Sequence, residues 1–230
     1  MIFRIVSFCV ITCAIVTLLS LSAWQIKRLQ WKNDIIDKLD LEYQKNPANY
    51  VYNFNALKKL YREETPIRYG QIKGLFLHDK TMLFGPKPHD KKPGYHVVTP
   101  LQLDSGIILV HRGWISDTHK DQLNRSVTST ALNGIMRKPE WNSFTPNNNV
   151  DNNVWTKLDI ADIAQKKNVE TIAPVIFYTE TKTSEYIIPQ STKWYPRNKH
   201  KQYAIFWFIM ACALISVLLI FKRQASQEQS

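Results

Sequence analysis

The chain has 230 residues, with 30 Lys or Arg against 19 Asp or Glu, so its formal net charge is +11. All three cysteines, Cys9, Cys13 and Cys212, lie in apolar stretches near the two ends. The sequence between them therefore excludes internal disulfides and thiolate-bound zinc, copper or iron–sulfur centres. It also contains no P-loop, Gly-x-Gly-x-x-Gly, Gly-x-Ser-x-Gly or His-Glu-x-x-His motif. An enzyme is not expected.

The basic charge favours binding to anionic lipid head groups or to an acidic partner. Nucleic acid is not expected, because no recognition motif or dense basic run accompanies the charge. A solvated, lysine-rich surface is the alternative, and composition alone leaves both interpretations open.

Two uncharged apolar stretches lie at the ends, residues 5–24 and residues 203–221. At about 1.5 Å per residue, each makes a helix of roughly 30 Å, the thickness of the bilayer's hydrocarbon core. We predict two transmembrane helices, 5–24 and 203–221, that flank one extramembrane domain, 25–202, and a short polar tail, 222–230. The first stretch is expected to be an uncleaved span, because it is longer than the apolar part of a usual signal peptide.

In chain order, residues 25–44 keep helical spacing, so the first helix is expected to continue beyond the membrane. Further helices are predicted at 55–61 and 158–167, and a loop at 142–153. Runs rich in Ile, Val, Leu and aromatic residues predict the strands, which are 67–77, 81–84, 95–103, 107–115, 129–138, 173–179 and 185–188.

Consecutive strands with few helices between them predict an α+β domain, built on an antiparallel sheet or a partly closed barrel. Asp104-Ser105-Gly106 indicates a hairpin between two of these strands. Residues 107–110 are apolar on both faces, which predicts a central, buried strand.

Aromatic, basic and imidazole side chains gather where the predicted spans meet the domain. One helical face at the first exit carries Trp24, Arg28 and Trp31. One helical face at the second exit carries His200, Tyr203 and Trp207. The hairpin topology places both exits at the same membrane surface.

This set suits a flat, apolar ligand that bears carboxylates. A neutral imidazole, such as that of His200, can ligate iron, Arg28 suits a propionate, and Trp24, Tyr203 and Trp207 suit the faces of a ring. The alternative is an ordinary aromatic belt with basic anchors, which accounts for Trp and Tyr at membrane interfaces generally.

The other histidines have no ligand-like spacing. His111, in a predicted buried strand, is expected to be a hydrogen-bonded structural residue. His78, His89, His96 and His119 are expected in loops or on strand surfaces.

Five motifs in order resemble the surfeit locus protein one family. They are Trp24-Gln25-x-x-Arg28-x-x-Trp31-Lys32, Arg68-x-x-x-x-x-Gly74-x-Phe76, Gly94-Tyr95-x-Val97-x-Thr99-Pro100-Leu101, Gly106-x-x-x-Leu109-Val110-x-Arg112-Gly113-Trp114 and Asn198-x-His200-x-x-Tyr203-Ala204-x-x-Trp207-Phe208. Each is weak alone, but together they cover nearly the whole chain with matching topology.

The resemblance implies an assembly factor for cytochrome c oxidase, which helps haem insertion or maturation of the haem-bearing core subunit. Haem a is the implied cofactor and His200 the implied iron ligand or haem contact. The implied partners are the oxidase core subunit and the lipid bilayer. Gly113 and Trp114 are expected to hold the hairpin. The alternative is a cofactor-free membrane scaffold that binds an oxidase subunit.

The resemblance also implies that the domain faces the periplasm of a bacterial inner membrane, or the intermembrane space at a mitochondrial inner membrane. A count of basic residues beside the spans would instead place the domain in the cytoplasm. We follow the resemblance, because the positive-inside rule is weak for long loops.

Overall fold

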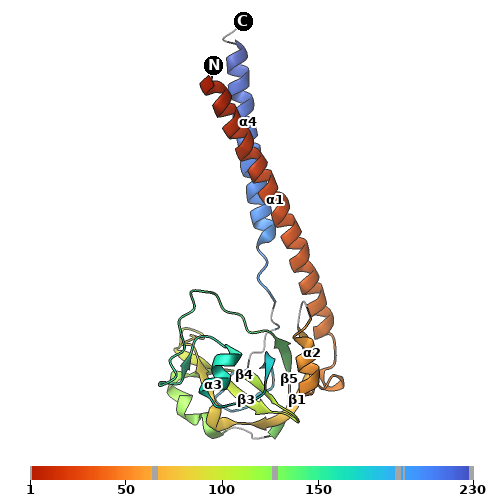
Figure 1. Cartoon of the computed structure of the whole chain (residues 1–230), viewed down its shortest axis with the longest axis vertical. Coiled ribbons are helices and arrows are strands. Elements are labelled where there is room, and N and C mark those ends of the chain that lie inside the picture. Colours follow the sequence, from red (N-terminus) through yellow and green to blue (C-terminus); the bar gives the residue numbers. More distant parts are fainter. Residues whose placement is uncertain (1, 64–66, 126–128, 190–192, 194, 228–230) are drawn as a thin grey trace. The chain divides into compact units, whose positions relative to one another are not determined.

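The computed structural model describes residues 2–63, 67–125, 129–189, 193 and 195–227 (Figure 1). It divides into two compact units, Met1–Lys38 with Trp194–Ser230, and Leu39–Lys193. The first holds most of the long terminal helices, and the second holds the sheet.

The terminal helices are α1 (Ile2–Tyr43) and α4 (His200–Gln227). Among the described helices, these are long and apolar enough to cross a membrane. Only 6% and 11% of their most apolar windows are buried, unlike the core helices of a soluble protein. The predicted continuation of the first helix is confirmed, since α1 has no break at residue 24. α4 begins before residue 203 and runs into the predicted tail, whose residues 228–230 lie outside the described part.

The less exposed residues of α1 and α4 follow the spacing of a helix pair. On α1 they recur every three or four residues, at Ile11, Ile15, Leu18, Ser22, Gln25 and Leu29. On α4 they do the same, at His200, Ala204, Trp207, Ala211, Leu214 and Leu218. Hydrogen bonds join the two helices, including one from the Ser22 hydroxyl to the Ala204 carbonyl at 3.0 Å. We call these two rows the seam.

The second unit contains the sheet and its short helices. In chain order its elements are α2 (Phe54–Leu60), β1 (Arg68–Phe76), β2 (Met82–Phe84), β3 (Gly94–Gln102), β4 (Ile107–Ser116), β5 (Ser129–Arg137), β6 (Val154–Trp155), α3 (Ile160–Lys166) and β7 (Ile172–Thr179). Single turns of 3-10 helix lie at Pro47–Asn49 and His78–Lys80, and a longer one lies at Asp117–Arg125.

The described strands form one sheet in the order β1-β5-β7-β4-β3-β2-β6, and β1 also pairs with β3. This last pairing closes β1, β5, β7, β4 and β3 into a ring, which confirms the α+β class and the partly closed barrel. The sheet is mixed, because β4–β7 and β2–β6 are parallel. β7 follows the crossover through α3, and a crossover returns the chain in the same direction, as parallel pairing requires.

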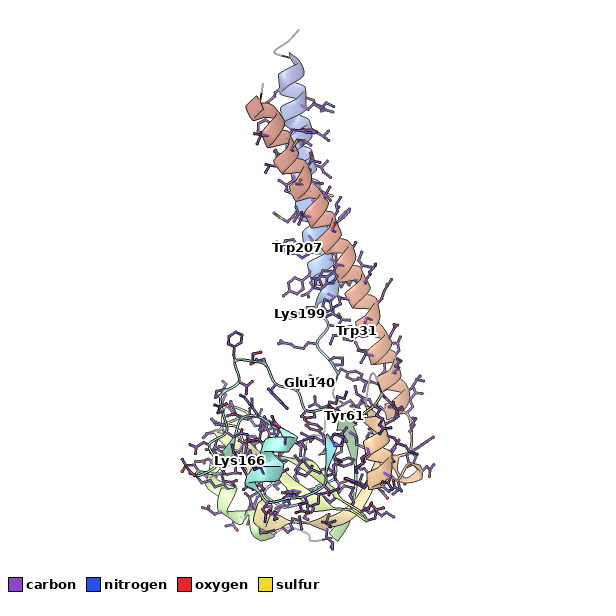
Figure 2. The ribbon with its side chains drawn as sticks, in the orientation of Figure 1. Trp31, Tyr61, Glu140, Lys166, Lys199 and Trp207 are labelled. Atoms are coloured by element: carbon purple, nitrogen blue, oxygen red, sulfur yellow. The ribbon has the colours of Figure 1, made fainter. Side chains whose placement is uncertain are left out.

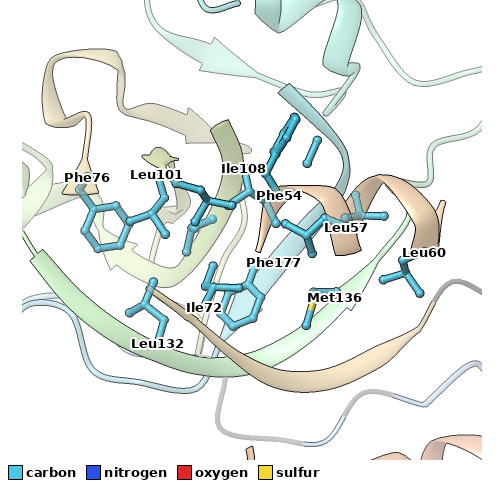
Figure 3. Packing of buried hydrophobic residues seen from close by; sticks show 14 residues of the cluster. Phe54, Leu57, Leu60, Ile72, Phe76, Leu101, Ile108, Leu132, Met136 and Phe177 are labelled. Atoms are coloured by element: carbon cyan, nitrogen blue, oxygen red, sulfur yellow. The ribbon is translucent and has the colours of Figure 1, made fainter. Parts of the chain in front are cut away.

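β4 is the predicted central strand, with β7 on one side and β3 on the other. Its residues alternate between two cores, which explains why it is apolar on both faces. Ile108 packs with Phe54 and Leu57 of α2 in the cluster of Figure 3. Leu109 packs in the opposite cluster, with Ile163 of α3. The hairpin at 104–106 is also confirmed, since β3 and β4 are antiparallel neighbours.

Two strand predictions differ from the structure. Predicted strand 185–188 is reduced to a single bridge, between Ile188 and Trp114. β6, only two residues long, follows the predicted loop 142–153 and gives too short a pattern to detect.

Candidate functional site

His200 begins α4 and contacts α1 through its imidazole. Its Nδ1 lies 2.7 Å from Oε1 of Gln25, which is buried in the seam. Asn198 secures the same turn, because its carboxamide accepts from the His200 backbone N–H at 3.4 Å and donates to Asn33 of α1 at 3.0 Å. The half-buried imidazole is therefore held at a fixed position beside α1.

The Gln25 contact occupies one of the two nitrogens of the His200 ring. When Nδ1 donates to this amide oxygen, the neutral imidazole is the tautomer whose Nε2 lone pair is available to a metal. Nε2 has no hydrogen-bond partner among the described residues. A neutral imidazole whose other nitrogen is fixed by a hydrogen bond is the usual state of a histidine metal ligand. The residue chemistry therefore fits an iron atom at Nε2.

Arg28 lies between two tryptophans of the same helix. Its guanidinium carbon is 5.8 Å from the Trp24 ring centroid and 4.9 Å from that of Trp31. All three side chains are exposed. A cation–π contact uses the face of the guanidinium and leaves its N–H edges free to donate. Arg28 can therefore bind a carboxylate while it remains stacked.

Tyr203 and Trp207 lie on α4, where they line a shallow pocket of about 380 Å³ with Gln202 and Phe206. Trp207 is half-buried in the seam, and its ring meets that of Phe206 edge-on at 5.1 Å. Figure 2 shows Trp207 on α4 and Trp31 on α1. Tyr203 is half-exposed.

The predicted site residues thus fall into separate local groups. His200 is paired with Gln25, Arg28 is stacked with Trp24 and Trp31, and the remaining aromatic residues line a pocket on α4. The roles of Gln25 and Ser22 as partners across the seam were missed by the sequence reasoning. The signal that could have found them is a polar residue at an otherwise apolar seam position.

The sequence model of the SURF1 family matches residues 12–212, which is most of the chain. The chain belongs to the SURF1 family. This is the surfeit locus protein one family that the motifs resemble, a family of cytochrome c oxidase assembly factors rather than of known enzymes.

Curated relatives from bacteria and an animal agree with the SURF1 assignment over most of their length. The SURF1-like protein of Rickettsia felis is 28% identical over 216 residues, covering 90% of this chain and 92% of the relative. That of Rickettsia bellii is 28% identical over 221 residues, covering 92% and 88%. The SURF1-like protein of Drosophila melanogaster is 27% identical over 220 residues, covering 86% and 71%.

A second cluster of titratable residues lies inside the sheet unit of this SURF1-family chain. His111 packs between His96, with ring centroids 4.7 Å apart, and Tyr178, with centroids 4.9 Å apart, and both ring pairs are tilted. The guanidinium carbon of Arg137 lies over the Tyr178 ring, 4.0 Å from its centroid. Nδ1 of each histidine is buried without a hydrogen-bond partner in the described part of the chain. Packing of rings, not hydrogen bonding through Nδ1, thus holds His111.

His96 was expected in a loop or on a strand surface, but the structure places it within β3, against His111. The strand register explains the contact. Val98 pairs with His111, and a bulge beside Val97 then shifts the pairing by one residue. His96 lies two residues before Val98, on the same face of β3, and so reaches the His111 ring diagonally.

We expect the His111 cluster to make the fold acid-sensitive. Burial, together with the charges of His96 and Arg137, lowers the His111 pKa from 6.5 to about 3. Between these values the unfolded chain binds a proton that the folded chain does not, so stability falls as pH decreases from 6.5 toward 3. The loss reaches up to about 1.4 kcal/mol per pH unit.

His111→Phe keeps the ring packing and removes this proton, so it is expected to lose less stability on acidification. Urea unfolding at about pH 7 and about pH 5 measures the difference. The matched control is His119→Phe, because His119 also packs on a tyrosine, Tyr186, but is exposed. Equal acid sensitivity of wild type and His111→Phe would contradict the assignment.

Proposed function

We propose that this chain handles haem a as cargo at the membrane surface while the haem-bearing core subunit of cytochrome c oxidase is matured. The observation that carries the proposal is the 2.7 Å contact between His200 Nδ1 and Gln25, since it leaves Nε2 available to iron. Membership of a family of oxidase assembly factors supports the same process.

The remaining residues have distinct roles in this proposal. Arg28 binds a propionate through its N–H edges while its face stays on the two tryptophans. Tyr203 and Trp207 present the apolar surface of the α4 pocket to the macrocycle. The cargo supplies the iron and the propionates, and the chain binds and orients them.

The proposed location is a bacterial inner membrane, with spans at 5–24 and 203–221 and the domain of residues 25–202 in the periplasm. The two apolar helices support attachment to a membrane. A mitochondrial inner membrane is the alternative, since SURF1-like relatives occur in bacteria and in animals.

A cofactor-free scaffold is the second candidate. Specific contacts favour it, because Gln25 already binds His200 and the two tryptophans already stack on Arg28. Such contacts also suit residues that only pair α1 with α4 and anchor them at the interface. In this version the chain binds an oxidase subunit through the basic domain and carries no haem.

The absorption spectrum of the purified full chain, co-expressed with haem a synthesis, separates the two functions. We expect a haem a band in the wild type and its loss in His200→Ala. The matched control is Asn198→Ala, which removes another contact between α4's first turn and α1 but keeps the imidazole. This variant is expected to retain the band.

One result would overturn haem binding, and two would overturn the assignment of His200 as its ligand. The first is a wild-type protein without a band, which would leave the scaffold function. The second is a His200→Ala protein with full haem occupancy, which would place the iron elsewhere. Equal loss in His200→Ala and Asn198→Ala would attribute the effect to pairing of the helices and would also remove His200 as the ligand.

A further inference from the structure

The loop of residues 138–153, between β5 and β6, carries two exposed aromatic side chains. Phe144 is 94% exposed, more than any other large apolar side chain that the structure describes, and Trp141 is 44% exposed. Figure 1 shows this segment as an extended loop that stands away from the sheet. Isolated exposed apolar residues are ordinary on protein surfaces, but two aromatics on one projecting turn are not.

Hydrogen bonds fix the turn that presents Phe144. The Asn142 side-chain oxygen accepts from the Phe144 backbone N–H and from the Thr145 hydroxyl, both at 3.0 Å. The Thr145 N–H donates to the Asn142 carbonyl at 3.1 Å. A defined turn therefore holds the exposed phenyl ring outward. The backbone of this turn is already ordered, so it loses little further conformational entropy when the ring enters an apolar environment.

Side-chain contacts hold both ends of the loop against other elements of the sheet unit. At its start, the Lys138 ammonium lies 4.3 Å from the ring centroid of Tyr61, at the end of α2. Figure 2 labels Tyr61 and also Glu140, which lies two residues after Lys138. On the return, the Asn148 carboxamide accepts from the Thr156 N–H at 2.9 Å and donates to Asp162 at 2.7 Å. Only the segment with the two aromatics projects between these attachments.

The environment that fits this turn is the head-group region of a bilayer. Trp and Phe partition to that depth, where an apolar ring is buried next to polar groups. The terminal helices hold the chain at a bilayer, so the loop meets lipid at high effective concentration. Residues 25–202 also carry 27 of the 30 basic residues and 18 of the 19 acidic ones, and this positive excess attracts anionic lipid.

We propose that the segment of residues 141–145, which contains the Asn142–Thr145 turn, inserts Trp141 and Phe144 into the surface of the bilayer that anchors the chain. The insertion gives the sheet unit a third attachment to the membrane, besides α1 and α4. It rests on membrane attachment of the helices and does not depend on haem binding, so either proposal can fail without the other.

Lipid quenching of a fluorophore at the turn tests the proposal. The full chain is placed in nanodiscs of phosphatidylcholine and phosphatidylglycerol, with its exposed cysteines, Cys9, Cys13 and Cys212, replaced by alanine. Phe144→Cys then carries an environment-sensitive fluorophore. We expect emission at shorter wavelength than for the label in buffer, and loss of emission when the lipids carry brominated acyl chains.

The matched control is Leu75→Cys with the same label, because Leu75 is also an exposed apolar residue of this unit but lies on β1. Quenching at residue 144 and not at 75 supports insertion of the turn, and Trp141→Ser is then expected to reduce it. The tip makes no core contact, and an unchanged unfolding temperature of each labelled protein confirms that it is folded.

Three results would overturn the proposal. Label 144 could remain water-exposed in the nanodiscs. Labels 144 and 75 could be quenched equally, which would mean that the unit lies on the bilayer without using this turn. Label 144 could shift only after purified oxidase core subunit is added, which would make the turn a protein-docking site.

Discussion

Gly113→Ala is expected to lower the free energy of unfolding of the sheet unit by about 3–5 kcal/mol. Gly113 has a φ of +126°, which side-chain-bearing residues rarely adopt. A Cβ at this position would also collide with the carbonyl oxygen of Ile188. That oxygen accepts from the Trp114 N–H at 2.8 Å, and the Ile188 N–H donates back to Trp114 at 2.8 Å, so relief of the collision breaks this bridge.

The measurement is urea unfolding of the full chain in detergent, followed by tryptophan fluorescence. Ile188→Ala is the control, because it shortens the half-exposed side chain and leaves both backbone hydrogen bonds in place. It is expected to cost less than about 1 kcal/mol. Similar losses of unfolding free energy in the two variants would contradict the prediction. They would show that the Ile188 side chain, and not the close approach of the Ile188 backbone to Gly113, stabilises this contact.

Arg112→Ala is expected to cost about 3–5 kcal/mol, because it empties a fully buried site and leaves buried acceptors without a donor. The guanidinium donates to the Thr183 hydroxyl at 3.0 Å, the Thr183 carbonyl at 3.2 Å and the Thr99 hydroxyl at 3.4 Å. It also lies 4.8 Å above the Phe76 ring. Burial lowers the Arg112 pKa to about 10, so the group stays charged at neutral pH.

The Arg112 contacts join β4 to the segment that follows β7, so the same substitution should expose residues 180–189 to protease. Limited proteolysis and urea unfolding measure the two effects. The control is Arg68→Ala on β1, whose guanidinium forms a partly exposed ion pair with Glu63. Such pairs contribute about 1 kcal/mol or less. A loss at Arg112 no larger than that at Arg68 would contradict an anchoring role.

The strands could be predicted because the pattern of apolar residues within each strand reflects which of its faces are buried. Residues 107–110 of β4 are all Ile, Leu or Val because both faces of the strand are covered, and this pattern is local. The pairing of β1 with β3 and of β4 with β7 joins residues far apart in sequence, and no local pattern records it. The contact of His96 with His111 was missed for a related reason, since it joins two strands and depends on the register between β3 and β4.

At the helix ends, spacing correctly placed Arg28 on one face with Trp24 and Trp31, because a single helix fixes that geometry. The partner of His200 could not be predicted in this way. Gln25 reaches the imidazole only because α1 and α4 face each other along a particular row of residues. That row depends on how two separate helices are rotated, which neither sequence alone determines.

The closure of the ring has a consequence for biosynthesis. β1 meets β3 over only two residue pairs, whereas it meets β5 over eight, and β7 must enter between β5 and β4 before the circuit is complete. β7 ends at Thr179, so the barrel cannot form until nearly the whole segment between the two apolar helices has been synthesised. Until then β4 and β5 present unpaired edges, which are prone to aggregation. Emergence of the last strand, shortly before the second apolar helix, is therefore the step that protects the domain.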